Sequence, residues 1–300
     1  MIDFHTLDVF TTAPYAGNPL AVVLGADHLS TAQMQTIARE FNLSETIFVR
    51  RPADPAHSAE VRIFFPTAEI PFAGHPTIGC AILLAQMAQG DGDWVHDIKL
   101  EEQAGLVPVR VVKTGDRTSA EFVAPVIPHA HPGQVSNGDC AAALGLSETE
   151  IGFSNHAPGV WAGGPAFLYI PVADADALAR ARPMEPDWSA LMAAGGVDSA
   201  YLYTPSADGG YQARMFSPGA GIPEDPATGS ASAILAAQLL AAGELGPGTT
   251  EIPLRQGVEM GRPSDIGLTV TRSSDGAIGE VRIKGAAVRI SHGQISPPKA

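Results

Sequence analysis

The second half of this chain repeats a sequence pattern of its first half, and this repeat limits the possible folds more than any other feature. RIFFP at residues 62–66 is followed by IP at 70–71, and RMFSP at 214–218 is followed by IP at 222–223, at one constant offset. Each copy then continues through a loop rich in proline and glycine into an apolar helix. The pattern predicts two similar domains, with chance resemblance as the alternative.

The two apolar helices indicate how each domain is built. We expect them at about residues 77–89 and 230–242, with Gly243 as a left-handed stop for the second. Both are apolar on almost every side, which a helix tolerates only when it is fully enclosed. The sequence therefore predicts an α+β fold of two pseudo-symmetric domains, each a curled β-sheet around a central apolar helix.

Local patterns predict several further elements. Residues 2–10 alternate in polarity and residues 19–24 are apolar, with a turn between them that favours a hairpin. Ser30 and Gln33 form a capping box for a helix that ends near Asn42. Strands are expected at residues 46–50, 59–65, 98–100, 106–112 and 119–123, and the Pro- and His-rich residues 125–133 resemble a linker.

The net charge of the chain argues against some classes of binding partner. The formal net charge is −14 over 300 residues, which argues against nucleic acid or an anionic membrane as the partner. No secretory signal is visible, and the apolar runs are shorter than the ~20 residues that a membrane-spanning helix needs. We expect a small-molecule partner, and an anion would have to be bound by local backbone dipoles.

The cysteines point to no metal or disulfide framework. Cys80 and Cys140 are the only two, and neither lies in a spacing typical of metal ligands. We expect no metal and a cytoplasmic location. Cys80 lies within an apolar run and is interpreted as a small buried hydrophobic residue.

Each Pro/Gly loop ends where its apolar helix begins. These loop ends are residues 72–77 and 224–230. The first turn of a helix has unpaired backbone N–H groups and a partial positive charge, so each loop end is a candidate anion site. Taken singly, either one could be an ordinary helix start.

Four segments together resemble the phenazine-biosynthesis PhzF-like isomerases in order and spacing: GNPLAV at 17–22, NLSET at 42–46, AGHPT at 73–77 and EDPATGSA at 224–231. This resemblance implies a diaminopimelate epimerase-like fold and a cofactor-independent isomerase that forms a homodimer. It also implies that a strand near residues 286–291 returns to the first domain. We expect domains at residues 1–120 plus 279–300 and at 121–278, with a small carboxylate substrate bound between them.

The resemblance further implies the reaction chemistry. In the epimerase with this fold, two cysteines at the helix starts transfer protons, and the matching positions here are Ala73 and Thr228. Neither can do this work, which disfavours an amino-acid epimerase or racemase. The family's general acid/base corresponds to Glu45, and burial at the start of an apolar strand would raise the pKa of that carboxyl. Without the resemblance, Glu45 would be interpreted as a solvent-facing strand residue.

The remaining site residues also follow from the resemblance. His75 and Asp225 are its proton-handling partners, although Asp225 could equally cap the second helix. Candidate substrate-binding residues are Asn18, Ser44, Gly74, His75, Gly229 and Ser230, of which Asn18 and Ser44 are expected mainly to support the turn at Glu45. The other histidines, including His156, are given no role. The reaction is a double-bond isomerisation or an epimerisation, and the alternative function is a non-catalytic metabolite-binding protein.

Overall fold

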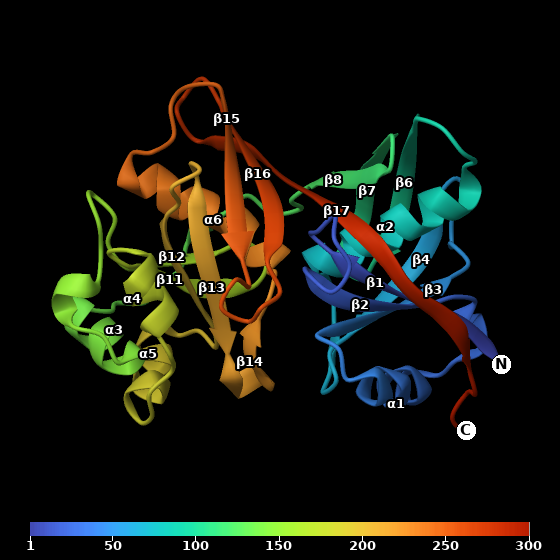
Figure 1. Cartoon of the computed structure of the whole chain (residues 1–300), viewed down its shortest axis with the longest axis horizontal. Coiled ribbons are helices and arrows are strands. Elements are labelled where there is room, and N and C mark those ends of the chain that lie inside the picture. Colours follow the sequence, from blue (N-terminus) through green and yellow to red (C-terminus); the bar gives the residue numbers. More distant parts are fainter. Residues whose placement is uncertain (300) are drawn as a thin grey trace. The chain divides into compact units, whose positions relative to one another are not determined.

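The computed structural model describes residues 1–299, and the chain divides into two compact units (Figure 1). Met1–Pro125 and Lys284–Ala300 belong to unit 1, and Val126–Ile283 forms unit 2. Both units contain helices and strands, which confirms the expected α+β class. Among the described residues, no helix is both long and apolar enough to cross a membrane.

Unit 1 contains two α-helices, a 3-10 turn and most of its strands in its N-terminal part. The elements are β1 (Ile2–Val9), β2 (Asn18–Val23), η1 (Ala26–His28), α1 (Thr31–Phe41), β3 (Glu45–Arg50), β4 (Ala59–Phe64), β5 (Glu69–Ile70), α2 (Gly74–Ala88), β6 (Trp94–Glu102), β7 (Gly105–Thr114) and β8 (Arg117–Val123). The capping box of Ser30 and Gln33 at the start of α1 is confirmed, as is the end of that helix at Asn42.

The strands of unit 1 pair with one another in a sheet, and the predicted hairpin of β1 and β2 forms its beginning. β1 pairs antiparallel with β2, β2 pairs parallel with β3, and β3 pairs antiparallel with β4. β4 pairs parallel with β6, which continues antiparallel through β7 and β8. The last strand, β17 (Ile278–Ile295), pairs antiparallel with β1 along the whole of β1.

Helix α2 is enclosed by these strands, as its composition predicts. It packs against β1, β2 and β3 and against β6, β7 and β8, and buried residues lie on every side of it. Gly79 permits the close approach to β1 and β2, because a Cβ there would lie 2.5 Å from Leu20 Cδ2 and 2.8 Å from Val9 Cγ2. The second turn of α2 is thereby held against β1 and β2.

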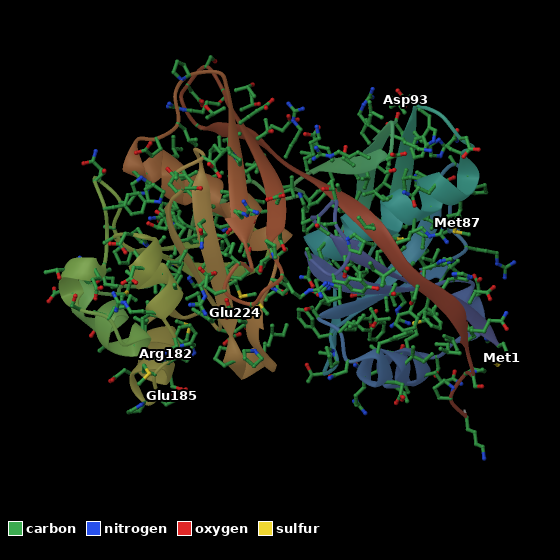
Figure 2. The ribbon with its side chains drawn as sticks, viewed as in Figure 1. Met1, Met87, Asp93, Arg182, Glu185 and Glu224 are labelled. Carbon is green, nitrogen blue, oxygen red and sulfur yellow. The ribbon has the colours of Figure 1, made fainter. Side chains whose placement is uncertain are left out.

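Unit 2 has more helices than unit 1. Its elements are β9 (His129–Ala130), α3 (Asn137–Leu144), η2 (Glu148–Glu150), β10 (Gly159–Ala162), β11 (Ala166–Pro171), α4 (Ala175–Arg180), α5 (Asp187–Gly195), β12 (Ala200–Pro205), β13 (Tyr211–Ser217), η3 (Pro218–Ala220), β14 (Ile222–Asp225), α6 (Gly229–Ala242), β15 (Thr249–Gln256) and β16 (Ser264–Arg272). Glu224, labelled in Figure 2, lies on β14.

Helix α6 is the enclosed helix of unit 2. It packs against β9, β10, β11 and β16, it is buried on all sides, and Gly243 ends it with φ 81° as predicted. β11 pairs parallel with β12, β12 antiparallel with β13, and β13 parallel with β15. This succession of pairings matches that of β2, β3, β4 and β6 in unit 1.

Two features of unit 2 differ from the sequence-based expectation. Helices α3, α4 and α5 were not predicted, and they pack with β11 and β12 into a separate apolar cluster that includes Leu144, Leu178 and Trp188. The expected linker at 125–133 contains β9, which pairs with β10 and so contributes to the sheet of unit 2.

Candidate functional site

Unit 1 brings three of the predicted residues to the start of two parallel strands. Asn18 is the first residue of β2 and Glu45 the first of β3, and Leu20 lies opposite Glu45 in the strand register. His75 is the second residue of α2, whose first turn is packed beside β2. Glu45 is only 8% exposed, so the alternative of a solvent-facing strand residue is wrong.

Glu45 and His75 are in direct contact. Glu45 Oε2 lies 3.3 Å from His75 Nδ1, and both side chains are buried. Burial lowers the pKa of His75 to about 3, and the hydrogen bond with the backbone of Pro19 acts in the opposite direction without overcoming it. The imidazole is therefore neutral near pH 7, and the contact is not an ion pair.

The first turn of α2 presents groups that need partners. The first intrahelical hydrogen bond runs from the N–H of Thr77 to the carbonyl of Ala73, so the amides of Gly74 and His75 precede the helical ladder. His75 is 2% exposed, and its Nε2 has no hydrogen-bond partner among residues 1–299. A buried polar atom and two helix-start amides thus lie within one turn.

Unit 2 holds the other predicted residues around the start of α6. Asp225 ends β14 and is 6% exposed, and its Oδ2 accepts a 2.5 Å hydrogen bond from Thr228 Oγ1. Thr228 is the N-cap of α6 and makes no side-chain capping bond of its own. Its N–H is instead bound by Gln256 Oε1 at 3.1 Å, and Gln256 Nε2 donates to the carbonyl of Asp225.

The predicted residues therefore fall into two groups. Asn18, Ser44, Glu45, Gly74 and His75 belong to unit 1, whereas Asp225, Gly229 and Ser230 belong to unit 2. Ser44 lies in the turn before β3, and Gly229 and Ser230 open α6.

Two polar residues beside these helix starts were missed by sequence reasoning. Glu102 ends β6 and lies against Thr77 in the first turn of α2, and Gln256 ends β15 and lies against Thr228. Both are buried. The signal that could have found them is the repeat itself, because LEE at 100–102 and LRQ at 254–256 follow the two apolar helices at matching positions.

A cavity of about 380 Å³ in unit 2 lies away from the predicted residues. Its wall includes Phe153, Tyr211 and Leu239, together with Glu244 just after the C-terminus of α6. Beside it, His156 is buried, with Nδ1 2.8 Å from the Tyr203 hydroxyl. None of the predicted site residues lines this cavity.

Comparison with known proteins gives one consistent family. The family model described as phenazine biosynthesis-like protein matches residues 7–293. An uncharacterized isomerase of Mesorhizobium japonicum is 42% identical over 294 residues, covering 96% of each chain. A trans-2,3-dihydro-3-hydroxyanthranilate isomerase of Pseudomonas chlororaphis is 36% identical over 300 residues, covering 98% of this chain and 99% of that protein.

A solved structure gives the same result for the fold. The crystal structure of a PhzF-family phenazine biosynthesis protein of Bacillus anthracis matches with a TM-score of 0.86 at 24% identity. The match covers 98% of this chain and 99% of that chain. The expected fold is thereby confirmed over nearly the full length.

Proposed function

Because the chain belongs to the phenazine biosynthesis-like protein family and is an isomerase, we propose that it moves a proton within a small carboxylate-bearing substrate, with Glu45 as the proton carrier. The buried contact between Glu45 and His75 is the observation that carries this proposal. The contact places the buried carboxyl group of Glu45 beside the neutral imidazole of His75.

The proposed reaction needs only a proton acceptor that later becomes the donor. Glu45 as carboxylate removes a proton from carbon, and the electron pair moves into an adjacent unsaturated group of the substrate. The protonated Glu45 then returns the proton at another carbon, so atoms and electrons balance without a redox partner. Return at the same carbon would instead give an epimerisation, which the same residue could perform.

A neutral His75 suits this role. A positively charged imidazole 3.3 Å from Glu45 would hold that carboxyl in its ionised form, which opposes its function as a proton donor. The neutral ring instead offers Nε2 for a hydrogen bond to the substrate. We therefore assign His75 to orient the substrate beside Glu45.

The starts of α2 and α6 are proposed to bind the anionic groups of the substrate. The amides of Gly74 and His75 in unit 1, and those of Gly229 and Ser230 in unit 2, lie ahead of the first intrahelical hydrogen bonds. Such amides and the helix dipole favour an anion without a basic patch. This suits a chain whose net charge is −14.

An amino-acid racemase that uses two thiols is disfavoured. Ala73 and Thr228 are the N-caps of α2 and α6, the positions where the resemblance would require cysteines. The two cysteines of the chain are buried elsewhere, and burial raises the pKa of Cys140 to about 12 and that of Cys80 far above its ordinary value. Neither thiol is suited to proton transfer near neutrality.

The substrate can be sought by deuterium exchange. A panel of carboxylates, including trans-2,3-dihydro-3-hydroxyanthranilate from the name of the Pseudomonas chlororaphis relative, is incubated with the protein in D₂O. Incorporation of deuterium at carbon, followed by NMR and mass spectrometry, is the expected result. Ligands that bind without any exchange would favour the alternative of a metabolite-binding protein.

The variant Glu45→Gln tests the proton carrier. It keeps the size of the side chain but removes the transferable proton, so we expect turnover to fall by ~10²–10⁴-fold with little change in ligand affinity. Glu40→Gln, on the exposed face of α1, is the matched control and should keep wild-type turnover. Unchanged turnover in Glu45→Gln would move the role to another residue, with His75 first.

Three further features are part of the proposal. Asp225→Asn should reduce turnover less than Glu45→Gln, because the amide oxygen can still accept the hydrogen bond from Thr228.

Activity should survive dialysis against a chelator if the enzyme is cofactor-independent. Sedimentation should report a homodimer, and a monomer would contradict that expectation.

A further inference from the structure

Glu102 is a buried carboxyl group that the proposed reaction does not use. It ends β6, is 8% exposed, and lies with Oε1 2.7 Å from Thr77 Oγ1 in the first turn of α2. Its other oxygen, Oε2, has no hydrogen-bond partner among residues 1–299. An ionised carboxylate in such a place would leave a charged oxygen unsatisfied, which is costly.

The number of hydrogens on Thr77 determines which group is the donor. Thr77 Oγ1 lies 2.8 Å from the carbonyl oxygen of Ala73 and 2.7 Å from Glu102 Oε1, but a hydroxyl has one hydrogen to donate. The carbonyl can only accept, so the hydroxyl hydrogen is needed there. Each contact has a hydrogen of its own only if Glu102 carries a proton and donates it to Thr77.

The start of α6 supports this assignment of the hydroxyl hydrogen. Ser232 occupies the position in α6 that Thr77 occupies in α2, three residues after the first residue of the helix. Ser232 Oγ donates to the carbonyl of the N-cap Thr228 at 2.9 Å, as Thr77 does to the N-cap Ala73. The bond from hydroxyl to N-cap carbonyl is thus a repeated feature of the two helix starts.

In unit 2, the position that corresponds to Glu102 is occupied by a neutral residue. Leu100 pairs with Ala59 in unit 1 and Leu254 with Tyr211 in unit 2, so two residues further on Glu102 corresponds to Gln256. Gln256 donates through its amide to Thr228 Oγ1 at 3.0 Å. A protonated Glu102 has the same shape and the same ability to donate to a threonine hydroxyl.

Among residues 1–299, no cation lies close enough to Glu102 to stabilise its ionised form. From α2 it faces Thr77 and Cys80, and Cys80 is buried and neutral. Charged Glu60 and Arg62 alternate with the buried residues of β4, and the neighbouring Glu101 bonds to the backbone of residues 53 and 54. β7 presents Gly105 opposite Glu102 in the register.

We propose that Glu102 is a positioning residue held as a neutral acid, which donates to Thr77 and keeps negative charge away from the anion-binding turn of α2. This inference rests on the proposed anion site at Gly74 and His75. Burial raises the pKa of Glu102 to about 8. Above that pH the ionised carboxylate competes with a bound anion for the positive end of the helix, and affinity falls.

The test measures the affinity of inorganic sulfate between pH 6.5 and 9.5 by calorimetry. Sulfate keeps its charge over this range, and His75 and Cys80 do not titrate in it. We expect wild-type affinity to fall about tenfold or more with a midpoint near pH 8, since a like charge beside the site opposes binding. Glu102→Gln should keep the pH 6.5 affinity up to pH 9.5, whereas Asp97→Asn, on the exposed face of the same strand, should behave as wild type.

Infrared spectroscopy reports the proton directly. Wild-type protein at pH 7 should show a protonated-carboxyl band that is lost above about pH 8 and is absent from Glu102→Gln. No such band at pH 6.5, a Glu102→Gln variant with the wild-type pH dependence, or a variant that fails to fold would each overturn the role of Glu102. Wild-type protein that binds no sulfate at any pH would instead overturn the anion site of the proposed function.

Discussion

At the scale of single residues, the protonation of Glu102 also determines how stability responds to pH. Its pKa is raised from 4.5 to about 8 by burial, so the folded state binds this proton more tightly than the unfolded state. For a raised pKa, the stabilising contribution is complete below pH 4.5 and is lost as pH rises through 8. Alkaline conditions should therefore weaken the wild-type protein.

Glu102→Gln should remove this loss. Since one pKa unit corresponds to about 1.4 kcal/mol, we expect the variant to gain stability relative to wild type by roughly 3–4 kcal/mol between pH 5 and pH 9. Urea unfolding followed by circular dichroism at the two pH values measures the change. Parallel pH profiles for the two proteins would mean that Glu102 is ionised in the folded state.

Some residues of the candidate site can be predicted from the sequence and others cannot. Glu45 and His75 stand in two short motifs, and the family resemblance supplies their roles. Their 3.3 Å contact could not be predicted, because it depends on how closely α2 approaches β2 through Gly79. Glu102 was missed because a glutamate at the end of a strand is usually exposed, and only the fold buries it.

At the scale of elements, the repeated RxFxP segment has a physical cause. Arg62 on β4 makes a two-pronged ion pair with Glu69 on β5 and lies over the ring of Phe64. Arg214 on β13 pairs in the same way with Glu224 on β14 and lies over Phe216. In each unit the pair ties the end of one strand to the short strand that leads to the enclosed helix, which explains why the sequence repeat is recognisable here.

Arg214 makes more hydrogen bonds and is less exposed than Arg62. Its Nη1 also donates to the carbonyls of Leu178 and Ala181 at the end of α4, and its side chain is 9% exposed against 17% for Arg62. We expect Arg214→Met to lower the free energy of unfolding by about 3–5 kcal/mol, because it leaves these carbonyls and the half-buried carboxylate of Glu224 unpaired. Arg62→Met should cost only about 1–2 kcal/mol. Chemical denaturation of both variants measures the difference, and equal losses would contradict this ranking.

Elements with strong local signals were predicted and those without were missed. The enclosed helices, the capping box at Ser30 and the first hairpin all follow from patterns of a few residues. Helices α3, α4 and α5 are short, and α3 and α5 are rich in alanine and glycine, so no apolar stripe marks them. β9 has two residues and exists only because β10 is available for pairing.

At the scale of the whole molecule, the chain closes its first unit with its last strand. β17 pairs with β1 from Ile2 opposite Ile295 to Val9 opposite Ala287, and the amide of Phe10 donates to the carbonyl of Ala286. β1 thus lies between β2 and β17. Folding of unit 1 therefore needs two segments separated by the whole of unit 2, which makes its contacts unusually non-local.

Deletion of residues 284–300 should therefore unfold unit 1 and spare unit 2. Without β17, β1 loses one of its two partners and becomes an exposed edge, and the buried Ala286 and Ala287 are lost from the core. The apolar cluster of unit 2 contains no residue after Phe216, so its packing does not depend on the deleted segment.

Hydrogen exchange followed by mass spectrometry should show protection lost across residues 1–125 but kept in α3, α5 and β12. The matched control deletes residues 297–300, whose described part lies beyond the end of β17 and accepts a hydrogen bond from Gln33 at the carbonyl of Pro298, so it should keep full protection. Protection lost equally in both units would mean that they unfold as one cooperative body, and protection kept in both would mean that β1 and β2 suffice without β17.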